Sequence, residues 1–126
     1  MAISVEGLYT LASSRIVELK FTRRNKHVSP STRRMLCTND MTLLNSKFGK
    51  ETLMYKKPKF RAPYNAKSKG LCTLWDILMQ EWRNVPTESV EVVSVVSTTP
   101  YKAFLDWFVN VIKPMSQEGK KRFMAQ

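Results

Sequence analysis

The sequence is poor in the residues that most catalytic and metal sites require. Histidine occurs once, as His27, in a stretch rich in Arg and Lys with no carboxylate beside it, which makes it a poor candidate for a general base. The two cysteines, Cys37 and Cys72, are more than thirty residues apart and neither lies near the histidine, so the spacing of zinc ligands is missing. With four glycines in all, no glycine-rich phosphate loop can be drawn. We expect no catalytic residue, no metal and no cofactor, and a protein that is not an enzyme.

Long apolar runs are missing as well. Residues 1–11 alternate polar and apolar side chains and lack the continuous apolar core of a signal peptide. No stretch approaches the ~20 apolar residues that a membrane-spanning helix needs. Small secreted domains usually carry a denser set of cysteines, so we expect two free buried thiols and a reducing compartment. The sequence therefore predicts an intracellular protein, cytoplasmic or nuclear.

What the sequence does contain is enough apolar and aromatic material for one core. Apolar residues make up 43% of the 126 residues, and thirteen of them are aromatic. We find no internal repeat and no low-complexity linker. The sequence predicts a single basic α+β domain over residues 1–114, followed by a flexible basic tail over residues 115–126.

The first half of the chain shows the period of two that is typical of strands. Residues 15–22 place Val17, Leu19 and Phe21 on one face, and residues 3–10 alternate more loosely, so the two segments predict an antiparallel pair. Three further segments are interpreted as short strands or irregular structure: residues 33–37, 41–48 and 51–56, with a hairpin turn at residues 48–50.

The second half predicts two helices and a strand. Residues 71–82 carry apolar side chains at i, i+3, i+4, i+7, i+8 and i+11, which is a continuous helical stripe. Residues 101–112 repeat this pattern after Thr99-Pro100, interpreted as a cap and a first-turn proline. Five valines within residues 90–96 favour a strand buried on both faces. The predicted fold class is α+β, a mostly antiparallel sheet with two amphipathic helices packed against it.

Positive charge is concentrated in one part of the chain. The 21 Lys and Arg residues exceed the 10 Asp and Glu residues, which gives a formal net charge of +11. Residues 15–69 contain 15 basic and 3 acidic residues, whereas residues 70–112 contain 2 basic and 5 acidic residues. Like charges at this density repel one another unless a partner neutralises them. Phosphates are the obvious partner, because each contact releases condensed counterions.

The candidate contact residues flank two predicted loops, one around Pro30 and one over residues 57–70. They are Arg23, Arg24, Lys26, Arg33 and Arg34 at the first loop, and Lys56, Lys57, Lys59, Phe60, Arg61, Tyr64, Lys67 and Lys69 at the second. The aromatic residues of the second cluster, with Tyr55, either stack on exposed bases or pin the loop to the domain.

These features predict non-enzymatic binding of nucleic acid, RNA or DNA, mainly through phosphate contacts of low sequence specificity. The chain lacks an aromatic RNP strand, a GXXG loop and a helix-turn-helix pattern. One alternative is a viral matrix-like or accessory protein that binds an anionic membrane surface and assembles by self-association. A third is a protein-interaction module that uses the exposed edge of its sheet or its acidic helical face, and this includes homo-oligomers in which the acidic half of one copy meets the basic half of another. A fourth is a metal-dependent enzyme whose scattered carboxylates meet in space. The nucleic-acid hypothesis requires that the cations share a solvent-facing surface and are not neutralised by the chain's own carboxylates.

Overall fold

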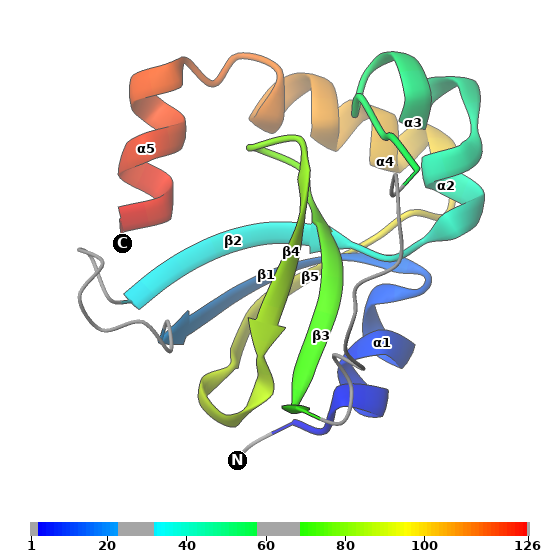
Figure 1. Ribbon diagram of the computed structural model, residues 1–126. Coiled ribbons are helices and arrows are strands. Elements are labelled where there is room, and N and C mark those ends of the chain that lie inside the picture. Colours follow the sequence, from blue (N-terminus) through cyan, green and yellow to red (C-terminus); the bar gives the residue numbers. More distant parts are fainter. Residues whose placement is uncertain (1–2, 23–31, 58–68, 126) are drawn as a thin grey trace.

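The computed structural model describes residues 3–22, 32–57 and 69–125 (Figure 1). The helices and strands follow one another with these bounds: α1 (Val5–Ala12), β1 (Arg15–Thr22), β2 (Thr32–Thr38), α2 (Met41–Asn45), α3 (Lys47–Glu51), β3 (Leu71–Asp76), β4 (Glu81–Pro86), the 3₁₀ turn η2 (Thr87–Ser89), β5 (Glu91–Ser97), α4 (Tyr101–Trp107), the π-helical turn η3 (Phe108–Ile112) and α5 (Gln117–Ala125).

The five strands form one antiparallel sheet in the order β4-β3-β2-β1-β5. Strand β1 lies between two partners, so that Val17 faces Cys37 of β2 on one side and Val95 of β5 on the other. The β1–β5 register shifts between Glu18 and Leu19. The protein is a single small α+β domain with an antiparallel sheet and several helices packed against it, which confirms the predicted fold class.

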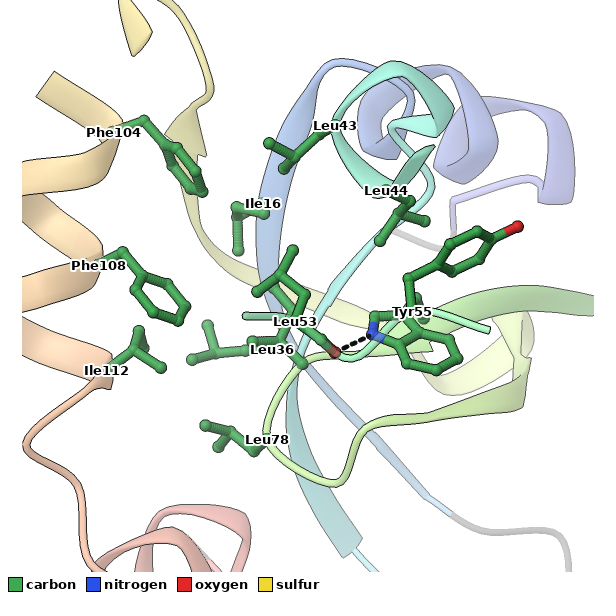
Figure 2. Packing of buried hydrophobic residues seen from close by; sticks show 12 residues of the cluster. Ile16, Leu36, Leu43, Leu44, Leu53, Tyr55, Leu78, Phe104, Phe108 and Ile112 are labelled. Atoms are coloured by element: carbon green, nitrogen blue, oxygen red, sulfur yellow. Dashed lines mark hydrogen bonds between the residues drawn. The ribbon is translucent and has the colours of Figure 1, made fainter. Parts of the chain in front are cut away.

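Apolar side chains fill both faces of the sheet. On one face lies α1, over a cluster made of Leu8, Ala12, Val17, Leu19, Phe21, Met35, Cys37, Cys72, Leu74, Val85 and Val90. The other face is covered by α2, α3, α4 and η3 (Figure 1), over a cluster made of Ile16, Leu36, Leu43, Leu44, Leu53, Tyr55, Trp75, Ile77, Leu78, Phe104, Phe108 and Ile112. Figure 2 shows Phe104 and Phe108 directed from their helix toward Ile16 and Leu36. Helices therefore pack against both faces of the sheet, with α1 as the only one of the described helices on one face.

The strand predicted over residues 3–10 is wrong, because this segment forms α1. The Ser4 side chain accepts a hydrogen bond from the Gly7 backbone N–H at 2.9 Å and caps the first turn. The apolar residues Val5, Leu8 and Ala12 recur at helical spacing, and the last two are buried. The strand predicted over residues 15–22 is confirmed as β1, and the segment 33–37 lies within β2.

The segments 41–48 and 51–56 contain no strand, and the hairpin turn predicted at residues 48–50 is wrong. Asp40 caps α2 by accepting from the Leu43 N–H at 3.1 Å, and Ser46 caps α3 by accepting from the Gly49 N–H at 3.1 Å. Two consecutive N-caps start two short helices here, and the residues 48–50 lie inside the second one.

The helix predicted over residues 71–82 is also wrong, because the segment is the β3–β4 hairpin. Asp76 forms its turn by accepting from the N–H groups of Leu78 and Met79, both at 3.1 Å, and Gln80 adopts a left-handed φ of 57°. Strand β3 is buried on both faces, with Leu74 in one cluster and Trp75 in the other. Because both faces of β3 carry apolar residues, their spacing in the sequence also fits the apolar stripe of a helix.

The strand predicted over residues 90–96 is confirmed as β5, but its burial on both faces is wrong, since β5 is an edge strand with exposed valines. The helix predicted over 101–112 is confirmed as α4 and η3. Pro100 rather than Thr99 takes the N-cap position, and no side chain caps the first turn. In the tail, residues 117–125 form α5, with Phe123 and Met124 packed against the core.

Two smaller predictions have a structural outcome. Cys37 and Cys72 are free and buried, as the sequence predicted. Among the described helices, none is long and apolar enough to cross a bilayer.

Candidate nucleic-acid interface

The candidate contact residues fall into two groups in the structure. Eight of them lie outside the described residues: Arg23, Arg24, Lys26, Lys59, Phe60, Arg61, Tyr64 and Lys67. The other five are described: Arg33, Arg34, Lys56, Lys57 and Lys69. The geometry of the site therefore rests on the residues that flank the segments 23–31 and 58–68.

The turn η2 binds a flanking residue of each segment. Thr22, the residue before segment 23–31, donates its backbone N–H to the Ser89 hydroxyl at 2.9 Å, and that hydroxyl donates to the Thr22 carbonyl at 3.2 Å. Gly70, two residues after segment 58–68, accepts from the N–H and from the hydroxyl of Thr87, each at 3.0 Å. Because Thr32 is the partner of Thr22 in the β1–β2 ladder, three of the four flanks of the basic segments meet at one end of the sheet.

The fourth flank lies elsewhere. The Lys56 carbonyl accepts from the Trp82 indole N–H at 3.1 Å, near the turn of the β3–β4 hairpin. Six-residue strands at 3.2–3.4 Å per residue separate this point from the η2 end by roughly 20 Å. The exposed Lys56 and Lys57 are therefore not brought together with the exposed Lys69.

Tyr55 anchors this flank in the core. Its ring makes edge contacts with the rings of Trp75 and Trp82, at centroid distances of 5.4 and 5.8 Å. The Trp75 indole N–H donates to the Leu53 carbonyl at 3.3 Å, the hydrogen bond drawn as a dashed line in Figure 2. A buried ring with two aromatic neighbours is not available for stacking on a base, so the anchoring alternative holds for this residue.

Arg33 and Arg34 are held by carboxylates of the chain itself. The Arg33 side chain is 7% exposed and donates to the Asp76 carboxylate at 2.7 Å. The Arg34 guanidinium donates to Glu18 at 2.5 Å and lies over the Phe123 ring, 4.5 Å from its centroid. These two arginines link parts of the fold to one another. The nucleic-acid hypothesis requires cations that the chain's own carboxylates do not neutralise, and Arg33 and Arg34 do not meet this requirement.

Asp76 is the centre of a buried ionic network. Besides Arg33, the Arg83 guanidinium approaches its carboxylate at 3.8 Å and also pairs with Glu81. Burial raises the pKa of Asp76, and the N–H groups of Leu78 and Met79 and the two guanidinium groups act in the opposite direction. The network joins β2, the hairpin turn and β4, which is a structural role.

Cations of α5 were not among the predicted site residues. Lys121 and Arg122 are exposed, and the helix packs on β2 through Phe123 and Met124. Figure 1 shows the C-terminal end of α5 beside the start of β2, which follows segment 23–31. The apolar pair at positions 123 and 124 was the signal for this placement, because a solvated tail gains nothing from two adjacent large apolar side chains.

Within the described ranges, no three His, Cys, Asp or Glu side chains gather as metal ligands would. The chain matches no protein-family model, no curated protein and no solved structure.

Proposed function

We propose that the protein binds nucleic acid through cations gathered at the η2 end of its sheet, mainly by phosphate contacts of low sequence specificity. The observation that carries this proposal is that η2 binds Thr22 and Gly70, the flanks of two basic segments, 23–31 and 58–68, that are separated by 26 residues in the chain. Arg23 and Arg24 follow Thr22 directly, and Lys67 and Lys69 precede Gly70. Cations from both segments thus attach to one end of the domain, where a polyanion can contact both.

The internal ion pairs narrow the set of contact residues. Arg33 and Arg34 stabilise the fold and are left out of the proposed contact set, which keeps the cations of segments 23–31 and 58–68 and Lys69 at the η2 flank. We add Lys121 and Arg122 to the proposed contact set, because both are exposed on α5, the helix that packs on β2. Clustered cations of this kind release counterions from a phosphate backbone, and the affinity must therefore fall steeply as salt rises.

The first experiment is fluorescence anisotropy of labelled nucleic acids across a series of salt concentrations. The probes are a single-stranded RNA of about 20 nucleotides, the DNA of the same sequence and a DNA duplex, all longer than the ~4–16 nucleotides that one small domain covers. We expect the logarithm of the association constant to fall linearly with the logarithm of the salt concentration, with a slope of about −0.7 per neutralised phosphate on a single strand. No binding at low salt, or binding that salt does not weaken, would overturn the proposal.

The second experiment locates the site by matched charge reversals. Lys67→Glu with Lys69→Glu changes cations close in sequence to Gly70, and Lys59→Glu with Arg61→Glu changes cations at the beginning of the same segment. Lys47→Glu with Lys50→Glu is the control, because these two exposed cations lie on α3. We expect at least about a tenfold loss of affinity in the first two variants and a loss of about threefold or less in the control, whose two charges lie outside both basic segments. Equal losses in all three would show a diffuse charge effect without a site.

Vesicle flotation tests the membrane alternative separately. Vesicles of phosphatidylcholine with and without phosphatidylserine are the probes. Binding that depends on phosphatidylserine, with no binding of nucleic acid, would replace the proposed function by attachment to an anionic membrane.

A further inference from the structure

Strand β5 leaves one side of its backbone without a neighbouring strand in the described part of the sheet, because it is the last strand in the order β4-β3-β2-β1-β5. Its sequence is EVVSVVS, in which Val93 is 42% exposed and Val95 is 45% exposed. Natural edge strands are usually protected by lysine, proline or bulges. β5 has neither lysine nor proline, and its protection is limited to Glu91 at one end and to the register shift opposite Glu18 and Leu19.

The pattern of β5 is complementary to itself. Residues 92–96 read Val-Val-Ser-Val-Val in both directions, with Ser94 at the centre. When two such strands run antiparallel about a two-fold axis near Ser94, each valine of one copy lies opposite a valine of the other. Opposite β-branched side chains are a favourable cross-strand pair. A second copy of β5 places a valine opposite each valine, whereas a strand of unrelated sequence does not in general do so.

The charges at the ends of β5 favour the same arrangement. Glu91 begins the strand, and Ser97 ends it beside its β1 partner Arg15. Antiparallel pairing places the Glu91 end of one copy against the Ser97 end of the other, so that Glu91 and Arg15 of different copies approach across a small serine. A parallel arrangement would instead place Glu91 beside Glu91. Residues 70–112, which contain β5, carry 2 basic and 5 acidic residues, so two copies that meet here keep most of their positive charge apart.

We propose that β5 pairs antiparallel with β5 of a second copy of this chain and joins the two sheets into one continuous sheet across a two-fold axis. The occupant of the edge is thus a second copy. Because the two strands run in opposite directions, the η2 turns, which precede β5 in each chain, lie at opposite ends of the joint. The proposal does not depend on nucleic-acid binding, although a dimer would carry two η2 ends directed apart.

Sedimentation velocity over a range of protein concentrations measures this association. A single strand edge covers less area than a standard interface, so we expect a reversible dimer at micromolar concentrations. Val95→Lys places a charge at the centre of the joint on an exposed residue, and we expect the dimer dissociation constant to rise at least about tenfold. Val109→Lys is the matched control, because Val109 is 51% exposed but lies on η3, and this variant should dimerise like the wild type.

Charge exchange tests the orientation of the two strands. Glu91→Arg and Arg15→Glu should each weaken the dimer, and the double variant should restore it, since the pair is re-formed between copies with its charges exchanged. A dimer in which the double variant is weaker than either single variant would contradict the antiparallel arrangement.

Cross-linking tests the position of the axis. Ser94→Cys with a bis-maleimide that spans about 8 Å should give covalent dimers, because both directly opposite and diagonal residues fall within that reach. The wild type is the control, since its two cysteines are buried.

The proposal is overturned if the wild type stays monomeric up to the highest concentration, if Val95→Lys leaves the dissociation constant unchanged, or if Ser94→Cys does not cross-link while the protein dimerises. Thermal unfolding of each variant shows whether a lost dimer reflects a lost fold.

Discussion

The Arg33 guanidinium and the Asp76 carboxylate lie 2.7 Å apart, although 43 residues separate them in the chain, and their side chains are 7% and 1% exposed. The pair joins the start of β2 to the residue that forms the β3–β4 turn. Both ions lost their hydration on folding, so each depends on the other and on the backbone N–H groups around Asp76. A residue that charge counting assigns to a binding surface is in fact part of the core.

Asp76→Ala should therefore destabilise the protein strongly. The substitution leaves the Arg33 charge buried without its carboxylate and removes the acceptor of two turn N–H groups, and breaking a buried pair in this way costs about 3–5 kcal/mol. Glu81→Ala is the control, because Glu81 is an exposed partner of Arg83 and an exposed pair contributes about 1 kcal/mol or less. Urea unfolding followed by tryptophan fluorescence measures both. Similar losses in the two variants would show that the Arg33–Asp76 pair is not a stabilising contact.

The two cysteines should be chemically inert in the folded protein. Burial raises the pKa of Cys72 to about 12 and that of Cys37 well above its ordinary value, with Asp76 and Cys72 adding to the effect on Cys37. At pH 8, a thiol reagent should label neither cysteine in the native state and both after unfolding in urea. Rapid labelling of the native protein would contradict the buried placement.

The same thiols give a pH dependence of stability with a defined sign. Above the ordinary thiol pKa of about 8.5, the unfolded chain loses these protons while the folded chain keeps them. The free energy of unfolding should then fall as pH rises from about 8.5 toward 11. A variant with Cys37→Ala and Cys72→Ala should show a shallower decline over this range, which separates the thiols from the lysines and tyrosines that titrate nearby. An unchanged slope would mean that the thiols do not contribute.

The core residues Trp75 and Phe108 should be among the most sensitive positions. Trp75 is 2% exposed and contacts Tyr55 and Trp82, while Phe108 is packed against Phe48 on the side of η3. Trp75→Ala and Phe108→Ala should each cost about 3–5 kcal/mol in urea unfolding. Trp107→Ala is a control for the loss of a large ring that is only half-buried, and it should cost less.

Trp75 also shows where sequence patterns were sufficient and where they failed. That Trp75 and its apolar neighbours are core residues was predictable, because burial depends on side-chain type. Their secondary structure was not, because a strand buried on both faces carries apolar residues at helical spacings by coincidence. The turn residue Asp76 was the discriminating signal, since its carboxylate binds the N–H groups of Leu78 and Met79 and reverses the chain.

The helices before β3 left a readable signal of another kind. Ser4, Asp40 and Ser46 each stand directly before a helix and accept a hydrogen bond from a backbone N–H three residues later. These caps, and not the loose alternation of apolar residues, match the structure, because all three segments are helical. The candidate site was predictable as a set of basic residues, whereas the pairing of Arg33 with Asp76 and of Arg34 with Glu18 was not, because it depends on strand register.

Gly49 is required by the close approach of α3 to α2. A Cβ at this position would lie 2.3 Å from the carbonyl oxygens of Leu43 and Leu44, which is closer than any real contact. These are backbone atoms of the preceding helix, so relief requires that α3 moves away from α2 and pulls Phe48 out of its contacts with the rings of Phe104 and Phe108. We expect Gly49→Ala to cost at least about 1–3 kcal/mol, the usual range for overpacking.

Gly119→Ala is the matched control. Its Cβ would meet a serine hydroxyl at 3.3 Å on an exposed helix, and alanine is the better helix former, so the free energy of unfolding should change by about 1 kcal/mol or less. If Gly49→Ala is as stable as the control in urea unfolding, the two helices do not pack as closely as described.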